Sequence, residues 1–334
     1  MKLRYWFLLE TRYFVGDVGR TDLYGPKEAP RLVSNLYDSI FNKLLPLGDG
    51  VIVCPAHGTG SVCGVNIADR DESTLGIERA QNPVLQLKNR DDFTRYKVAE
   101  QPERPHYFRQ MEKYNLEGPP ILGCLPLPAP LTPAEFREEM ERGAVVVDTS
   151  EPAAYGGAHI KGSYSIWLGG LAPFAGWVLP HDKPILLVLE DQSRLETAVR
   201  YLIRLGYDNA HGYLKGGMEG WYNAGFPTEH LQLLTVHELK AKLDRAEELT
   251  ILDDRGQDEW NEGHIEGAKH IYVGHIQERM ADIPKDKPVA MVCNVGHRAG
   301  LGASILLREG CREVYTVLGS MTAWRAAGYP ISTE

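Results

Sequence analysis

The sequence predicts an α/β protein with two tandem domains, each built around a parallel sheet, preceded by a third unit. Two observations support this fold class. The chain repeats itself with a period of about 105 residues, which predicts two homologous domains over residues 131–230 and 233–334. Within each copy, short apolar runs alternate with helix-length segments, a pattern typical of strands and helices in a parallel α/β sheet.

The repeat is visible in two pairs of matching segments. Residues 146–163 read VVDTSEPAAYGGAHIKGS and residues 251–268 read ILDDRGQDEWNEGHIEGA, so Asp148 recurs as Asp253. The second pair lies near the end of each copy and reads GGMEGWYNAGFP in the first and GSMTAWRAAGYP in the second. Two ordered matches in each copy indicate a duplicated domain rather than a short repeated motif.

Each copy also begins with the same helix signal. Thr132 with Glu135, and Thr235 with Glu238, fit the capping box in which a hydroxyl and a carboxylate satisfy each other's backbone donors. The runs AVVVD, ILLVL, LTILD and VAMVC then predict strands, and the segments ETAVRYLIRLG and GLGASILLREG predict helices.

A proline-rich stretch separates the repeat from the rest of the chain. Residues 118–130 contain GPP and LPLPAP, which cannot continue a helix and are typical of an interdomain linker. Residues 1–117 are then predicted to form a separate unit.

Composition and charge exclude several classes of protein. The net charge is −9, and no run of lysine and arginine could form a local nucleic-acid footprint, so nucleic acid is not expected as a partner. No stretch approaches the ~20 apolar residues that cross a bilayer, so no membrane association is expected. The first ten residues lack the features of a signal peptide, which predicts a cytoplasmic protein.

One cysteine stands out by its surroundings. The chain has five cysteines, an odd and scattered set that fits neither a disulfide framework nor paired zinc ligands. Cys293 follows an apolar run and precedes a small-residue helix start, in the segment PVAMVCNVGHRAGLGASILL. A cysteine on such a loop lies at the positive end of a helix macrodipole, where backbone N–H groups can form an anion-binding nest.

These features predict that Cys293 is a nucleophile. The helix terminus and the nest favour thiolate over thiol, Gly296 lets the backbone approach the sulfur, and Arg298 adds a fixed cation. The alternative is that Cys293 is simply a buried small hydrophobic residue at a strand end. The spacing of cysteine, glycine and arginine favours the nucleophile.

At this point the chain resembles the rhodanese family over both copies. The second copy carries the opening motif LDDRGQDEWNEGHIEGAKHI, the pattern Cys-x-x-Gly-x-Arg and the closing motif GSMTAWRAAGYP. The resemblance implies that Cys293 takes a sulfane sulfur from a small donor and passes it to a thiol or cyanide, without a cofactor. It also implies that the loop cradles the persulfide; its remaining members are Asn294, Val295, Gly296 and His297.

Two details refine this expectation. The six residues from Cys293 to Arg298 match the loop length used for sulfur, whereas related phosphatases use one more. Members that use thiosulfate often carry a cation directly after the cysteine, where this chain has Asn294, which argues against thiosulfate as the natural donor. His297 either tunes the charge of the loop or is an ordinary exposed histidine.

The first copy is predicted to be catalytically silent. Alignment of YLIRLG with ILLREG places Leu189 at the position of Cys293, and the loop keeps Arg194 but has no strong nucleophile. Its opening motif also has Ser150 where the second copy has Arg255. The polar residues of the second opening motif are interpreted as structural, through turns and ion pairs; they are Asp253, Arg255, Glu259 and His264.

The N-terminal unit has a resemblance of its own. The segments FVGDVGRTDLYG, VIVCPAHGTGSVCG and ERAQNPVLQ look like the C-terminal half of a metallo-β-lactamase (αββα) domain, as in bacterial persulfide dioxygenases fused to rhodanese repeats. The His-x-His-x-Asp-His motif that holds metal in active members is absent, so iron and zinc are not expected; Asp17 and His57 are remnant positions. Half of such a sandwich would leave a sheet uncovered, which predicts a homodimer through this region.

The leading hypothesis is therefore a sulfurtransferase with one silent and one active module. The alternatives are a non-catalytic scaffold in which Cys293 senses sulfur or redox state, and a metallohydrolase or persulfide dioxygenase that obtains its missing ligands elsewhere. Steady transfer of sulfur to an acceptor separates the first hypothesis from the second.

Overall fold

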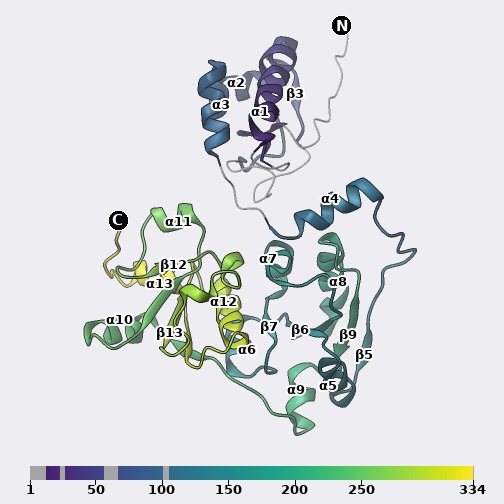
Figure 1. Ribbon diagram of the computed structural model, residues 1–334, viewed down its shortest axis with the longest axis vertical. Coiled ribbons are helices and arrows are strands. Elements are labelled where there is room, and N and C mark those ends of the chain that lie inside the picture. Colours follow the sequence, from purple (N-terminus) through teal and green to yellow (C-terminus); the bar gives the residue numbers. More distant parts are fainter. Residues whose placement is uncertain (1–12, 23–26, 56–66, 101–104, 334) are drawn as a thin grey trace. The chain divides into compact units, whose positions relative to one another are not determined.

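The computed structural model describes residues 13–22, 27–55, 67–100 and 105–333, and it divides into two compact units, Met1–Arg104 and Pro105–Glu334 (Figure 1). The boundary lies earlier in the chain than the predicted end of the N-terminal unit at residue 117. Helix α4 (Phe108–Glu117) packs with the second unit, because the Tyr107 N–H donates to the Gly176 carbonyl at 3.2 Å and the Tyr114 hydroxyl donates to Asp208 at 2.8 Å.

The first unit is a small α/β body with two antiparallel strand pairs. Strand β1 (Tyr13–Phe14) pairs with β2 (Asp17–Val18), and β3 (Ile52–Val53) pairs with β4 (Ser73–Thr74). Its helices are α1 (Ala29–Tyr37), η1 (Asp38–Leu44), η2 (Leu45–Leu47), α2 (Leu75–Gln81), η3 (Pro83–Gln86) and α3 (Arg90–Ala99). Val33, Leu36, Leu75, Val84 and Phe93 are buried together and form its core.

The second unit contains two five-stranded parallel sheets with the same strand order, which confirms the predicted pair of parallel α/β domains. The first sheet has the order β5-β9-β8-β6-β7. Its strands are β5 (Ala129–Leu131), β6 (Val145–Asp148), β7 (Tyr164–Ser165), β8 (Ile185–Val188) and β9 (Ala210–Leu214). Its helices are α5 (Pro133–Glu141), α6 (Pro152–Gly157), η4 (Leu168–Gly170), α7 (Leu171–Val178), η5 (Gln192–Arg194), α8 (Leu195–Arg204) and α9 (Gly217–Asn223).

The second sheet repeats this topology as β10-β14-β13-β11-β12. Its strands are β10 (Gln232–Leu234), β11 (Thr250–Asp253), β12 (Lys269–His270), β13 (Val289–Val292) and β14 (Val314–Val317). Its helices are α10 (Val236–Asp244), α11 (Gln257–Asn261), η6 (Val273–His275), η7 (Met280–Asp282), α12 (His297–Arg308) and α13 (Ser320–Ala326). Both predicted capping boxes are present, because the Thr132 and Thr235 hydroxyls accept the N–H groups of Glu135 and Glu238.

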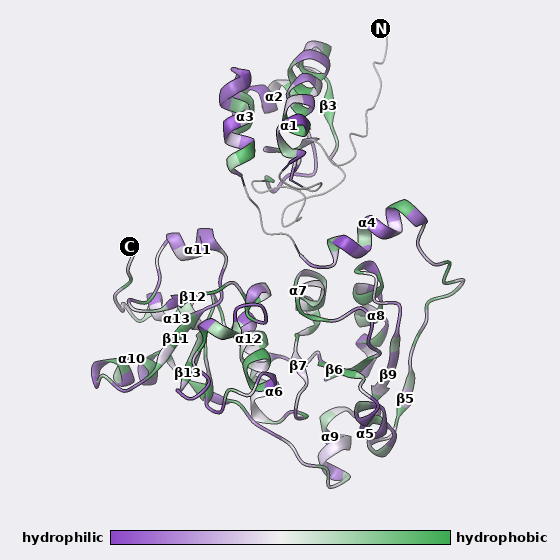
Figure 2. Ribbon diagram, viewed as in Figure 1, coloured by the Kyte–Doolittle hydropathy of each residue, from purple (hydrophilic) through white to green (hydrophobic). Residues whose placement is uncertain are grey.

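The two copies share one hydrophobic core. Alternate residues of each central strand point to opposite faces, so Val147 and Met291 enter a common cluster while Val146 and Val292 enter separate clusters on the outer faces. Figure 2 shows β6 in the hydrophobic colour and the outlying helix α11 in the hydrophilic colour. Within the described residues, no helix has the length and apolar character needed to span a membrane.

A buried carboxyl in the first copy gives a prediction about stability. Asp148 is fully buried, and Oδ2 has no hydrogen-bond partner in the described part of the chain. Burial raises its pKa from 3.8 to about 6, although hydrogen bonds from Ser150 oppose the shift. A carboxyl with a raised pKa in the folded state stabilises the fold at low pH, and this stabilisation is lost as the pH rises through about 6.

Asp148→Asn should therefore be more stable than the wild type at pH 7.5, by about 3 kcal/mol, and equal to it near pH 4. The amide keeps the oxygen that accepts the Ser150 N–H and cannot acquire a charge. Urea unfolding at the two pH values measures the difference. A variant less stable than the wild type at pH 7.5 would contradict the prediction.

Candidate active site

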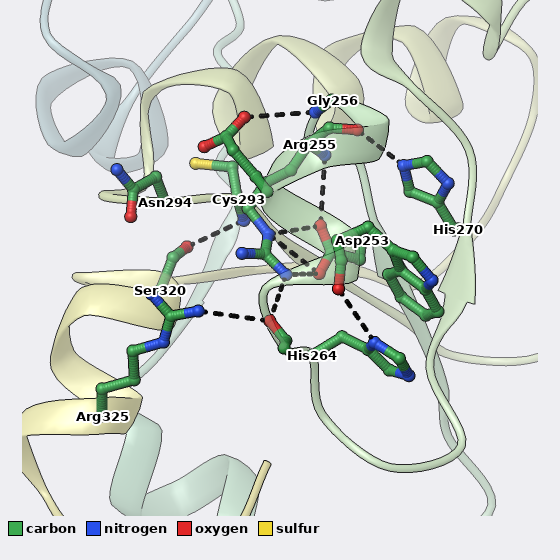
Figure 3. Close-up of polar contacts among 12 residues, drawn as sticks. Asp253, Arg255, Gly256, His264, His270, Cys293, Asn294, Ser320 and Arg325 are labelled. Carbon is green, nitrogen blue, oxygen red and sulfur yellow. Dashed lines mark hydrogen bonds and ion pairs between the residues drawn. The ribbon is translucent and has the colours of Figure 1, made fainter. Parts of the chain in front are cut away.

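Cys293 lies at the C-terminal end of β13, in the loop that leads into α12 (Figure 3). Its side chain is on the shared-core face of the sheet and only 1% of the residue is exposed. The loop over residues 293–296 is therefore the predicted strand-loop-helix arrangement, with a cysteine directly before a helix N-terminus. Such a terminus presents unpaired N–H groups and a positive dipole end to the sulfur.

The backbone of this loop is held by helix α13. The Cys293 N–H donates to the Ser320 Oγ at 3.2 Å, and the Ser320 hydroxyl donates to the Val317 carbonyl at 2.9 Å. In return, the N–H groups of Met321 and Thr322 donate to the carbonyls of Cys293 and Asn294 at 3.0 and 2.9 Å. These four bonds fix the direction in which the cysteine points.

Gly296 brings the sulfur into contact with the backbone. Its N–H donates to the Cys293 Sγ at 2.9 Å, and its φ of 109° is in a region that side chains with a Cβ rarely adopt. The Ala299 N–H also donates to the sulfur. The loop therefore has two N–H donors aimed at the reacting atom, as the sequence predicted for a nest.

The predicted preference for thiolate is wrong for the resting site. Burial raises the pKa of the Cys293 thiol, and the carboxyl of Asp254 raises it further. The N–H groups of Ala299 and Gly296 and the charge of Arg298 lower the pKa, but they do not outweigh burial. Asp254 was missed in the sequence. The available signal was a second acidic residue directly after Asp253 at the end of a buried strand.

Arg298 lies in the first turn of α12 but is not a free cation. Its two terminal nitrogens donate to the two carboxylate oxygens of Glu259 at 2.5 and 2.7 Å. Burial opposes charge on both groups, yet this bidentate contact raises the pKa of Arg298 and holds the pKa of Glu259 below its usual value. Glu259, interpreted above as structural, therefore determines how much charge Arg298 presents to the sulfur.

The other residues of the opening motif are structural, as expected. The Arg255 guanidinium lies 2.7 Å from Asp253, and both side chains are 1% exposed (Figure 3). Arg255 also donates to the Gly263 carbonyl at 2.9 Å, and the His264 ring stacks on Trp260. This buried network holds the turn between β11 and α11 in place.

The first copy contributes to the rim of the site. The Nε2 atom of His297 lies 3.0 Å from the Glu151 carboxylate, and its ring lies 4.7 Å from that of Trp167, so His297 has partners that the sequence did not indicate. A pocket of about 190 Å³ lies beside the loop. Its lining comes from both copies: Glu151, Pro152, Ala153, Leu233, Val295, Gly296, His297, Thr316, Leu318 and Gly319.

The first copy has no nucleophile at the corresponding place. Leu189 follows β8 as Cys293 follows β13, and the strand order places β8 and β13 at the same position in the two sheets. Leu189 is 2% exposed and belongs to the shared core. The geometry therefore agrees with a silent first copy.

The remnant metal positions are not brought together. Asp17 is buried in β2, where its Oδ1 accepts the Val18 N–H at 2.7 Å, and His57 lies outside the described residues. Among the residues that the structure describes, no three histidine, cysteine or carboxylate side chains are grouped as metal ligands.

Comparison with known proteins identifies the family. The model of the rhodanese-like domain matches residues 132–224 and 235–327, which together are more than half of the chain. The chain belongs to the rhodanese family. The putative sulfurtransferase YtwF of Bacillus subtilis is 37% identical to this rhodanese over 97 residues, which cover 29% of this chain and 93% of the relative. The putative sulfur carrier protein YrkF of Bacillus subtilis is 29% identical over 114 residues, or 34% of this chain and 60% of the relative.

A solved structure extends the likeness beyond the repeat. The metallo-β-lactamase from Staphylococcus aureus subsp. aureus COL is 29% identical to this rhodanese with a TM-score of 0.53, over 62% of this chain and 56% of that one. This agrees with the predicted assignment of the N-terminal region to part of a metallo-β-lactamase fold. The rhodanese thus spans little more than half the length of this structural relative and 60% of YrkF.

Proposed function

We propose that this rhodanese is a sulfurtransferase that moves a sulfane sulfur from a small donor, through a persulfide on Cys293, to a thiol or cyanide acceptor. One observation carries the proposal: the Cys293 Sγ lies at the N-terminus of α12 and accepts the Gly296 N–H at 2.9 Å. The same N–H groups would hold the negative charge of a persulfide, because backbone donors at a helix N-terminus favour anions.

The chemistry consists of two displacements at sulfur. In the first, the Cys293 thiolate attacks the outer sulfur of a donor R–S–S⁻; the Sγ–S bond forms, the donor S–S bond breaks and R–S⁻ leaves. In the second, an acceptor thiolate attacks the outer sulfur of Cys293–S–S⁻, the Sγ–S bond breaks and Cys293 is regenerated. No electrons are gained or lost overall, so the transfer needs no metal or redox cofactor.

The charges around the loop favour a persulfide over thiosulfate as the donor. Arg298 is already paired with Glu259, Asn294 stands after the cysteine, and Glu151 adds a carboxylate to the rim of the pocket. A doubly charged donor would therefore meet little positive charge that is not already paired, whereas an alkyl persulfide carries one charge and an apolar group that fits Val295 and Leu318.

Mass spectrometry tests the carrier directly. Incubation with an alkyl persulfide should add about 32 Da, one sulfur atom, to the peptide that contains Cys293 and leave the other cysteines unmodified. Subsequent cyanide should remove the mass and release thiocyanate, and prior dialysis against a chelator should change neither step. Equal labelling of several cysteines would contradict the assignment of the carrier. Labelling of Cys293 without release to any acceptor would indicate a sensor instead of an enzyme.

A further inference from the structure

A second titratable group lies beside the nucleophile without a partner. Asp254 is 0% exposed, and neither of its carboxylate oxygens has a hydrogen-bond partner in the described part of the chain. Burying an unpaired carboxylate is costly, because the charge loses its hydration and gains nothing in return. Such a group in a native site calls for a chemical or structural reason.

The sheet register places Asp254 next to Cys293. Strands β11 and β13 are parallel neighbours in which Asp253 is opposite Val292, and the Asp254 N–H continues the ladder to the Val292 carbonyl at 3.0 Å. Asp254 therefore stands opposite Cys293, on strands about 4.8 Å apart. Alternation along each strand directs both side chains to the shared-core face, where Leu252 and Met291 also lie.

The helix above this face leaves room for the carboxyl. A Cβ built on Gly302 of α12 would lie 2.9 Å from the Asp254 Oδ2 and 2.5 Å from the Met291 side chain. Only glycine at this position allows the helix to pass so close to the carboxyl.

The silent copy lacks all three parts of this arrangement. In the first sheet Asp148 is opposite Val188, so the residues that follow, Thr149 and Leu189, replace the aspartate and the cysteine. The alignment that pairs the two helices places Ala198 at the position of Gly302. The Thr149 hydroxyl is satisfied by the Val188 carbonyl at 3.0 Å. The carboxyl, the nucleophile and the glycine are thus present together in the active copy and absent together from the other.

The surrounding charges leave Asp254 as the unmatched group. The facing cations are Arg298 and Arg255, and each already binds a carboxylate, Glu259 and Asp253 respectively. Met291 and Ile276 bring apolar atoms to the same place. Two ion pairs are complete without Asp254, so its carboxyl is free to bind a proton without breaking either of them.

We propose that Asp254 accepts the thiol proton of Cys293 when the sulfur attacks its donor, keeps this proton while Cys293 carries the persulfide, and returns it when the sulfur leaves. This role rests on the proposed function and adds a proton acceptor to it. In the resting site the carboxyl is not bonded to Sγ, and rotation of its side chain toward the adjacent strand would bring the two together.

The steps balance in atoms and charge. During loading, Asp254–COO⁻, Cys293–SH and R–S–S⁻ give Asp254–COOH, Cys293–S–S⁻ and R–S⁻. During unloading, Asp254–COOH, Cys293–S–S⁻ and an acceptor R′–S⁻ give Asp254–COO⁻, Cys293–SH and R′–S–S⁻. The carboxyl and the cysteine together carry one negative charge in both states, so the buried site never has to hold a second one. Burial raises the pKa of Asp254 well above its ordinary value, which makes it able to hold the proton.

The test is the pH profile of Cys293 reactivity in the full chain, measured with two reagents: an alkyl persulfide and the neutral alkylating agent iodoacetamide. Asp254→Asn keeps the shape of the side chain but cannot accept the proton. Its rates at pH 7 should fall about tenfold with both reagents, and the alkaline limb should move to higher pH, where the rates recover. Asp254→Thr, which copies the first repeat, should behave in the same way if the amide disturbs folding.

Asp148→Asn is the matched control, because it removes a buried carboxyl from the silent copy and should leave both profiles unchanged. A faster reaction at pH 7 for Asp254→Asn, with the limb moved to lower pH, would mean that Asp254 only repels the thiolate, and the proposal would be overturned. A slower reaction with an unmoved limb would also overturn it, since a structural role alone gives that result. Failure of persulfide labelling in the wild type would sink the proposed function, while alkylation would still report on Asp254.

Discussion

Cys293→Ser should abolish sulfur transfer while the protein remains folded. The substitution changes one buried atom, and the hydroxyl can still accept the Gly296 N–H that now reaches Sγ. An alcohol, however, is a far weaker nucleophile than a thiolate and cannot form a persulfide. We expect turnover with any donor and acceptor to fall to background, measured as release of thiocyanate from cyanide.

The matched control is Cys311→Ser, which changes a second buried cysteine that lies after α12 and away from the loop. This variant should keep full activity and should still take up sulfur on Cys293. Turnover retained by the Cys293 variant, or lost equally in both, would show that the sulfur is carried by another group.

Arg298→Ala should slow transfer by about 2–4 kcal/mol, or roughly 30- to 1000-fold, if it resembles the loss of one preorganised electrostatic contact. The guanidinium lowers the pKa of Cys293 and neutralises Glu259 at the same time. Without it, a carboxylate remains near the sulfur and both the thiolate and the persulfide become less favourable. Single-turnover rates of loading measure the effect.

Two further variants separate charge from structure. Arg194→Ala removes the corresponding arginine of the silent copy and should have no effect on transfer. Combining Arg298→Ala with Glu259→Gln removes the unpaired carboxylate as well, so the double variant should recover part of the lost rate. A double variant slower than Arg298→Ala would contradict the charge argument.

The repeat made most of the fold predictable from the sequence. A duplicated domain doubles every signal, so the capping boxes at Thr132 and Thr235 and the apolar strands were each indicated twice, and all are present. The assignment of Leu189 to the place of Cys293 followed from the same alignment. The domain boundary was less predictable, because helix α4 precedes the proline-rich segment and only its contacts with Gly176 and Asp208 show where it packs.

The electrostatics of the site could not be predicted in the same way. The motif identified Cys293 and Arg298, but it did not indicate that Glu259 pairs with Arg298 across 39 positions in the sequence. The protonation of Cys293 depends on a balance between burial and several nearby groups. Neither burial nor these distances can be read from the order of residues, so the effect of Asp254 became visible only in three dimensions.

The hydrophobic core shared by the two sheets makes this duplication hard to reverse. A gene copy that has lost its activity is normally free to accumulate mutations and disappear. Here the inactive copy covers apolar residues of the active one, including the face that carries Cys293, and its Glu151 reaches the active loop. Deleting it would expose that face to water. Purifying selection on sulfur chemistry should therefore act on both copies, although only one of them performs it.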